Sequence, residues 1–555
     1  MSDLRSRRVG AAALAALLAV FAVRLAHTAL EKSYTYDEPH YVGTGLYLWR
    51  HRNYQWMEVL SAQPPLAFHL ASLPWLVADP GPVADTPSAG FELIRQPAAA
   101  LRRLRLLTRL PFIGLACWGA VLLFCWGREA AGTWVGLLAT FLYTFCPTVL
   151  ANAALAHSDI TVTVLYLQTL YAYWRWSRRP TAARIVLCGL SLGLALLAKL
   201  SAILLVPTLG ILVVLRAVGI PGASTAGTGT LGRRLAAAAG VLTVLGITAS
   251  TVLWIGYGGS FASAPATGEI YAHLPLPGYL RALLFDVKAN AGGRRTYLMG
   301  EFSAHGWWYF FPVAFAVKTP LAMLALLALA MLPRRGARRA APDDRTPAGA
   351  PASAAPGVGP VLGAGMGVYG LVACFVLKVP LGVRYILPFY PLLHLAVALR
   401  LAPQGGWRRW AALAACAWLT AASLRAHPDY LAYFNAAVGG PEQGHRYLLE
   451  SNLDWGQDLS TLARYLATRG NPPLHLAYFG RETPDSYGMR ARPLRDCKPV
   501  TGVVAVSMNF LHGLYSPRVF AQPDPDCWKW LAGREPVAQP GHSIAVYEVP
   551  PAPAP

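Results

Sequence analysis

Two acidic positions beside long apolar runs have residue types suited to acid–base chemistry. The first is Asp37-Glu38, which lies in the aromatic segment 34–41 directly after an apolar run. A carboxylate there can accept the proton of an attacking hydroxyl group if the two lie within hydrogen-bonding distance. Asp37 followed by Glu38-Pro39 is also typical of a helix N-cap, so the spacing alone leaves a capping role open.

The second acidic position is His157-Ser158-Asp159, between two apolar runs. A carboxylate close to hydrocarbon is costly to bury, which makes Asp159 a candidate functional residue. Two alternatives stay open for it. Asp159 caps the following helix, or it binds a divalent cation such as Mg²⁺ or Mn²⁺ together with Asp37, because hard cations prefer carboxylate oxygens. The sequence establishes no other cofactor.

Three cationic residues lie near the outer boundaries of the apolar runs, where they can contact an anionic group. Lys199 lies in a tight turn, Lys318 lies inside a run, and Arg384 begins another run. Such charges stabilise a developing phosphate anion best where little water is present. The structural alternative is that these long side chains extend towards lipid headgroups.

Aromatic residues cluster near a further histidine, with Trp307 and four other aromatic residues following His305. An interfacial aromatic belt explains this cluster. Stacking of a sugar on Trp307 is the functional alternative.

Long apolar runs separate these positions and indicate a membrane protein. Of 555 residues, 55% are hydrophobic and 14% are charged, whereas about 25% are charged in an average soluble domain. A helix that crosses about 30 Å of hydrocarbon needs roughly 20 apolar residues. We therefore predict a polytopic α-helical membrane protein with about eleven transmembrane helices, near residues 9–30, 110–127, 132–152, 159–176, 184–198, 200–216, 236–256, 310–332, 359–378, 384–401 and 409–424.

The distribution of arginine predicts which side of the membrane each loop occupies. The first run follows three arginines, and its length and interior Arg24 argue against a removable signal peptide. With the N-terminus inside, the arginine clusters of the short loops also lie inside, as the positive-inside rule requires. Two large extracytoplasmic loops, about 31–109 and 257–309, then lie outside. The inner loop 333–358 is predicted to be a flexible connector.

The tail differs in character from the rest of the chain. We expect residues 1–426 to form the transmembrane domain and residues 427–555 to form a small extracytoplasmic α/β domain. Its predicted elements are a helix at 457–468 and strands at 474–479, 503–506 and 544–549. Cys497 and Cys527 lie in this polar region and could form a disulfide if it is extracytoplasmic.

The net charge of +21 invites a nucleic-acid interpretation, because basic side chains neutralise phosphates. The arginines instead form short clusters between apolar runs, which is typical of cytoplasmic loops. No motif with interleaved stacking aromatics accompanies them. We therefore do not expect nucleic acid as a partner.

Several segments resemble the GT-C lipid-carrier-dependent glycosyltransferases, especially the protein O-mannosyltransferase and aminoarabinose transferase branch. The similarity spans most of the membrane region. Asp37-Glu38 with His40-Tyr41 matches the acidic pair in the first outer loop of that family. The resemblance implies that Asp37 is the catalytic base, that Glu38 supports it, and that His40 and Tyr41 contact substrate.

Other segments extend this resemblance: Gln63-Pro64-Pro65-Leu66, Arg109 with Gly127-Arg128-Glu129, Asn152 to Asp159, 297–308, Lys318-Thr319-Pro320, and Arg384-Tyr385-Ile386-Leu387-Pro388. It places His157, Asp159, His305 and Trp307 near substrate. The tail segment 451–458, Ser-Asn-Leu-Asp-Trp-Gly-Gln-Asp, also resembles bacterial members but has no defined role.

One departure from the family concerns the carrier phosphate. Some relatives have a phosphate-contacting lysine before Pro-Pro, where this chain has Gln63. Neutralisation of the phosphate must then come from other cations. The candidates are Arg384, Lys199, Lys318 and Arg109.

The resemblance implies transfer of a sugar from a polyprenyl-phosphate carrier to an acceptor hydroxyl at the outer membrane face, in one inverting step. The acceptor is a protein, a lipid or a glycan. An alternative is a flippase or transporter of lipid-linked sugar, since intramembrane charges also mark transport paths, although no inverted repeat is evident. A third hypothesis is a non-catalytic subunit whose tail recognises an envelope protein. Composition favours a bacterial inner membrane.

Overall fold

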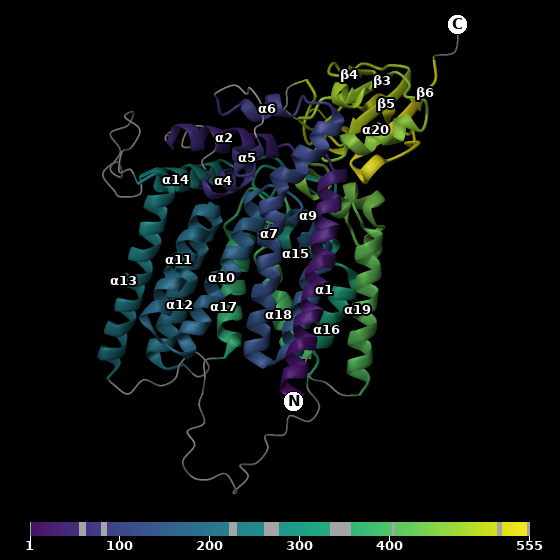
Figure 1. The fold of residues 1–555 in the computed structure, drawn as a ribbon. Coiled ribbons are helices and arrows are strands. Elements are labelled where there is room, and N and C mark those ends of the chain that lie inside the picture. Colours follow the sequence, from purple (N-terminus) through teal and green to yellow (C-terminus); the bar gives the residue numbers. More distant parts are fainter. Residues whose placement is uncertain are drawn as a thin grey trace.

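The computed structural model describes residues 2–54, 63–78, 86–220, 230–259, 277–333, 357–401, 406–518, 524 and 526–551. Long helices stand side by side, with the N-terminus at one end of this bundle (Figure 1). Short helices and a β-sheet gather at the opposite end, which we call the loop end. Residues 334–356 of the predicted connector lie outside the described residues.

All eleven predicted apolar runs are helical. They correspond to α1 (Ser2–Glu31), α7 (Ala98–Ala131), α8 (Thr133–Thr144) with α9 (Pro147–Ala153), α10 (Ser158–Arg178), α11 (Ala182–Ala198), η1 (Leu200–Leu204) with α12 (Leu205–Val218), α13 (Leu231–Gly256), α15 (Phe310–Lys318) with α16 (Leu321–Met331), α17 (Val358–Phe375), η3 (Val383–Ile386) with α18 (Phe389–Leu401), and α19 (Trp407–Arg425).

Not all of these helices are long and apolar enough to cross a membrane. Among the described residues, five helices are long and apolar enough to cross a membrane, or up to seven if each of two bent pairs is one span. Three further apolar helices are shorter. The prediction of a polytopic helical membrane protein is therefore confirmed, whereas the count of eleven spans stays a prediction.

Two of the apolar helices bend sharply where a proline interrupts them. The axes of α8 and α9 differ by 67°, and those of α15 and α16 by 110°. Proline lacks the backbone N–H that would continue the helix, and Pro147 and Pro320 follow these two breaks. After α9, His157 takes the N-cap position of α10.

Short helices cover the loop end of the bundle (Figure 1). They are α2 (Glu38–His51), α4 (Leu66–Ser72), α5 (Trp75–Ala78), α6 (Ala89–Leu93) and α14 (Pro277–Gly292), and an antiparallel hairpin of β1 (Thr296–Leu298) and β2 (Glu301–Ser303) follows α14. A Cβ atom at Gly45 would lie 2.1 Å from the Phe68 carbonyl oxygen, so glycine is required where α2 packs on α4.

The tail contains a four-stranded mixed sheet with the order β4-β3-β5-β6. β3 (Leu474–Ala477) pairs in parallel with β4 (Ala491–Pro493) and β5 (Gly502–Ser507), and β5 pairs antiparallel with β6 (Ile544–Val549). The leucines of α20 (Leu459–Ala467) pack on this sheet. The predicted helix and three strands are present, and the short strand β4 was not predicted. Cys497 and Cys527 form a disulfide, the pairing that the sequence suggested.

The chain between α19 and α20 packs against the bundle. It runs through short 3₁₀ turns, including η4 (Tyr430–Ala432) and η7 (Glu450–Asn452). Arg24, the charge inside the first apolar run, donates to the Tyr430 hydroxyl at 2.9 Å and to the Ser423 carbonyl at 3.0 Å. Residues about 400 positions away therefore supply the acceptors of this buried charge.

Candidate active site

A cavity of about 590 Å³ lies among the loop-end segments and the helix ends beneath them. One part of its wall is charged, and another part is apolar and comes from η1, α14 and α17. A cavity with these two surfaces fits an amphiphilic ligand with an anionic group. The charged wall contains Asp37, His157, Lys199, Asp286, Arg294 and Arg384, and the apolar wall includes Leu204, Phe285, Val372 and Leu377.

Asp37 faces this cavity and is available for chemistry. It occupies the N-cap position of α2, but its side chain makes no capping hydrogen bond. The side chain is 40% exposed, and its Oδ2 lies 3.7 Å from His157 Nε2. Burial opposes ionisation of the carboxyl, yet the nearby His157 and the charge of Arg384 outweigh it and hold the pKa of Asp37 below its ordinary value. Asp37 is therefore ionised at neutral pH and able to accept a proton.

Glu38 has entirely different surroundings from its neighbour. It is fully buried, and Arg109 donates to both of its oxygens, from Nε at 2.8 Å and from Nη2 at 2.7 Å. The amides of Thr35 and Ala156 donate to the same carboxylate, at 2.7 and 2.8 Å. Burial raises the pKa of Glu38, but Arg109 and these amide donors lower it by a larger amount. The pKa of Glu38 therefore lies below its ordinary value.

The Glu38–Arg109 pair lies behind the cavity wall and does not line it. The remaining N–H groups of Arg109 donate to the backbone that connects α1 to the acidic segment. It donates to the carbonyl oxygens of Ala29, Lys32 and Ser33 at 2.7–3.0 Å. The pair thereby joins that backbone, α7 and the turn before α10.

Asp159 lies in the first turn of α10 and is surrounded by cationic groups. It is buried, and His157 Nδ1 lies 2.7 Å from its Oδ2. Arg384 Nη1 lies 3.2 Å from the same oxygen, and the Lys199 ammonium donates to Oδ1. Asp159 thus holds Lys199 and Arg384 together at one point of the cavity wall, and His157 connects Asp159 to Asp37.

These partners leave little room for a metal ion at Asp159. Both of its oxygens already accept from nitrogen donors, and His157 uses one ring nitrogen on Asp159. A divalent cation would have to displace Lys199 or Arg384. In the described part of the chain, one group of three potential ligands was found, Cys497, Cys527 and Asp524, and its two cysteines form the disulfide.

Arg294 lines the cavity, although sequence reasoning did not select it. It follows Gly292-Gly293 at the end of α14 and is exposed towards the cavity. Its Nη2 donates to the Tyr515 hydroxyl at 3.0 Å. The pair Arg294-Arg295 in the predicted outer loop was the only available signal, and basic pairs in loops are too common to indicate a site.

Six other residues predicted for binding do not line the cavity: Asp159, His40, Tyr41, Lys318, His305 and Trp307. Lys318 is buried and donates to the carbonyl oxygens of Leu431 and Asn452, at 2.7 and 2.6 Å. His305 is exposed in the turn after β2, and Trp307 is partly buried. A side chain at Gly293 of the cavity wall would overlap the His305 ring, so His305 packs directly against Gly293.

His40 and Tyr41 lie beside Asp37 on α2. The Tyr41 hydroxyl donates to Gln63 Oε1 at 3.0 Å and lies 3.3 Å from His157 Nε2. His40 Nδ1 lies 3.3 Å from the Thr44 hydroxyl, and burial lowers the pKa of His40. Gln63, which replaces the lysine of some relatives, lines the cavity.

The sequence matches a known family over part of its length. Residues 14–254 match the family described as dolichyl-phosphate-mannose-protein mannosyltransferase. This segment contains Asp37, Glu38, Arg109, His157, Asp159 and Lys199. The match confirms the resemblance to the lipid-carrier-dependent glycosyltransferases. No match to a curated protein was found.

Solved structures give weaker similarities. ArnT from Cupriavidus metallidurans bound to undecaprenyl phosphate has 12% sequence identity, with 96% of this chain and 97% of that chain covered at a TM-score of 0.45. The archaeal oligosaccharyltransferase AglB from Archaeoglobus fulgidus, in complex with an inhibitory peptide and a dolichol-phosphate, has 14% identity, with 74% and 56% covered at a TM-score of 0.39.

Proposed function

We propose that this protein, whose residues 14–254 match a mannosyltransferase family, transfers a sugar from a polyprenyl-phosphate carrier to an acceptor hydroxyl. One observation carries the proposal: a single cavity contains the ionised Asp37, three cationic side chains and an apolar wall. Glycosyl transfer uses all three, because a base accepts the hydroxyl proton, cations stabilise the departing phosphate, and an apolar surface holds the lipid.

The carrier phosphate binds to Arg384, Lys199 and Arg294. All three line the cavity, and the first two converge on Asp159, which offsets their mutual repulsion before the donor arrives. Arg294 adds a positive charge from another segment of the wall. Guanidinium and ammonium groups form short, charge-assisted hydrogen bonds with phosphate oxygens. Arg109 and Lys318 act on the fold instead, because their donors are already used.

Asp37 acts as the base. The acceptor oxygen bonds to the anomeric carbon of the donor, while the bond between that carbon and the phosphate oxygen breaks. The hydroxyl proton passes to the Asp37 carboxylate, and the polyprenyl phosphate leaves with the bonding electrons. This single displacement inverts the configuration at the anomeric carbon. Glu38 positions the Asp37 loop through Arg109 and Ala156.

The reaction takes place at the outer face of the membrane. The loop end carries the cavity and the long loops that the positive-inside rule places outside. Eleven spans with the N-terminus inside bring the tail to that face, and the inner membrane of a bacterium is the proposed location. The sugar is a hexose or pentose, with mannose the first to test, and the acceptor is a protein, lipid or glycan hydroxyl.

The test is sugar transfer by the purified full chain in liposomes. Radiolabelled polyprenyl-phosphate mannose is supplied with a crude envelope fraction as acceptor, followed by pentose-charged carriers. We expect Asp37→Asn to lower the transfer rate about 10²–10⁴-fold, the usual contribution of a general base, with an unchanged melting temperature. The matched control is Asp496→Asn, which alters an exposed carboxylate in the tail.

Two results would contradict the proposal. Transfer that persists in Asp37→Asn would remove Asp37 from the role of base. Movement of the labelled lipid across the bilayer without sugar transfer from any donor would instead support the transporter alternative.

A further inference from the structure

The tail segment 451–458 is polar in sequence and yet completely buried. Every residue from 450 to 460 is buried, including Ser451, Asn452, Asp454 and Gln457. Burial of polar groups is costly unless they are hydrogen-bonded, so the partners of this segment show what it does. The proposed chemistry above assigns it no role.

The first part of the segment holds the cationic wall of the cavity. Ser451 Oγ accepts from Arg384 Nε at 3.0 Å, and Asn452 Oδ1 accepts from the Val383 amide at 2.8 Å. The Arg384 guanidinium carbon lies 4.1 Å from the centroid of the Trp455 ring. The tail therefore fixes one edge and one face of the Arg384 guanidinium group. In this orientation Arg384 Nη1 is directed at Asp159.

The middle of the segment holds the acidic loop and His157. The Trp455 carbonyl oxygen accepts from the Tyr36 amide at 2.9 Å, directly before Asp37. The Trp455 ring also meets the His157 ring, with centroids 5.0 Å apart and a 60° angle between the planes. Trp455 therefore contacts Arg384, His157 and the backbone of Tyr36, the residue before Asp37, at once.

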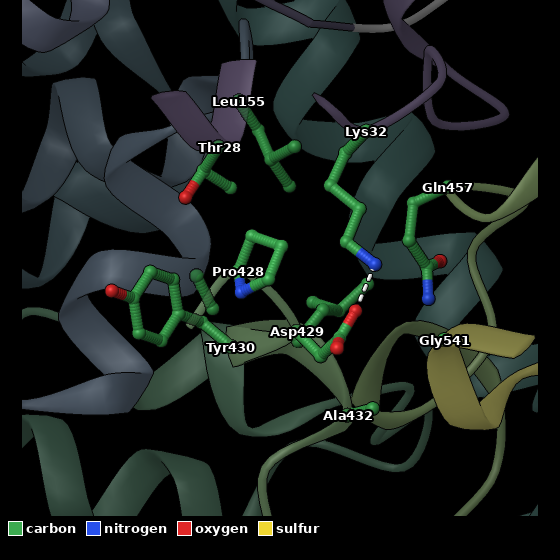
Figure 2. A pocket seen from close by; sticks show the side chains of 11 residues that line it. Thr28, Lys32, Leu155, Pro428, Asp429, Tyr430, Ala432, Gln457 and Gly541 are labelled. Carbon is green, nitrogen blue, oxygen red and sulfur yellow. Dashed lines mark hydrogen bonds and ion pairs between the residues drawn. The ribbon is translucent and has the colours of Figure 1, made fainter. Parts of the chain in front are cut away.

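The last part of the segment is anchored to the end of α1. The Gln457 carbonyl oxygen accepts from the Ser33 amide at 2.9 Å. Lys32 forms ion pairs with Asp458 and Asp429, and Figure 2 shows its ammonium directed at Asp429 beside Gln457. Breaking a buried pair of this kind is costly, so the anchor is firm.

We propose that residues 451–458 are a positioning element of the active site, in which Trp455 holds the Asp37 loop, His157 and Arg384 in one arrangement. This inference rests on the proposed function. The tail is then part of the transferase and not a separable recognition module. The physical basis is preorganisation: a base and a phosphate-binding cation work only if they are held at the correct separation.

Trp455 is the first residue to test, in the full chain with the transfer assay described above. Misplacement of reacting groups by about 1 Å costs roughly 100-fold in rate. We therefore expect Trp455→Leu to lower kcat by about that factor, and Trp455→Phe to recover most of it because a ring remains over Arg384. The control Trp528→Leu removes another buried tryptophan of the tail and should leave kcat unchanged.

Ser451→Ala is a milder second variant in case Trp455→Leu does not fold. It removes the acceptor of Arg384 Nε and a longer hydrogen bond to the Leu381 carbonyl oxygen, and it leaves the Trp455 ring in place. We expect the KM for the lipid-linked donor to rise about tenfold while kcat changes little. A purely structural role would lower the melting temperature without this split between KM and kcat.

The outcomes separate the two proposals. If the wild-type chain transfers no sugar, the proposed function fails. If the wild-type chain is active, and folded Trp455→Leu and Ser451→Ala variants keep its kcat and KM, the positioning role is overturned while the proposed function stands.

Discussion

The adjacent carboxylates Asp37 and Glu38 show that residue type alone does not assign a role. Asp37 is partly exposed to the cavity and has no capping bond, whereas Glu38 is fully buried and bonded to Arg109. Both have a lowered pKa, so ionisation does not distinguish them. Access to the cavity does distinguish them, and it supports the proposal that Asp37 accepts the proton and Glu38 positions the loop.

This contrast predicts that neutralising Glu38 lowers the stability of the protein, whereas neutralising Asp37 does not. Glu38→Gln leaves the buried Arg109 charge without its partner, and such losses cost about 3–5 kcal/mol of stability. We expect a clear fall in the melting temperature in detergent, whereas Asp37→Asn keeps the wild-type value. Glu548→Gln breaks an exposed pair with Arg469 and is the control, with an expected effect below about 1 kcal/mol. Equal melting temperatures for Glu38→Gln and wild type would contradict the positioning role.

Arg294 is the residue whose role depends most on tertiary structure. If it binds the carrier phosphate, Arg294→Gln should raise the KM for the donor roughly tenfold or more, because charged hydrogen bonds contribute about 1.5–3 kcal/mol. The melting temperature should change little, since the side chain is exposed to the cavity. Arg295→Gln is the matched control, because Arg295 stacks on Phe302 at 3.8 Å and does not line the cavity. An unchanged donor KM in Arg294→Gln would exclude Arg294 from phosphate binding.

At the scale of elements, the segment 451–458 contains a buried carboxyl group, that of Asp454. Burial raises the pKa of Asp454 to about 8, with a contribution from the negative charge of Asp458. The folded state therefore holds a proton that the unfolded chain releases near pH 4. The stability from this group is complete below about pH 4 and is lost as pH rises through about 8.

This shift predicts how stability depends on pH. The melting temperature of the wild-type chain should fall between about pH 4 and pH 8 by more than that of Asp454→Asn, because asparagine imitates the protonated form and does not titrate. Parallel melting curves in detergent across this range measure the difference. Identical pH dependence in the two proteins would show that Asp454 ionises normally.

At the scale of the whole molecule, the cavity is assembled from segments far apart in the chain. Asp37, His157, Lys199, Arg294 and Arg384 all line it, and Ser451 and Trp455 hold part of its wall from behind. The proline breaks and the loop-end helices bring these segments together. The tail sheet lies at the loop end, as the short helices do (Figure 1). Bundle and tail therefore form one functional unit in the proposed reaction.

The sequence alone indicated the helices, the two acidic positions and most of the cavity cations. Apolar run length is a local property, so every predicted run is helical, and the tail strands follow from local alternation and turn residues. Asp37, Asp159, Lys199 and Arg384 stood out because charges beside hydrocarbon are rare.

Only the tertiary structure decided which of these residues share a cavity. Arg109 and Lys318 look like phosphate ligands in sequence, but their donors satisfy buried carboxylate and carbonyl groups. Arg294 lies in a segment without a distinctive local pattern, and Trp455 lies in a segment that the sequence singled out but gave no role. Their proposed roles come from contacts that join residues far apart in the chain. Burial and pairing of charged groups depend on such distant partners, and no local pattern in a sequence specifies them.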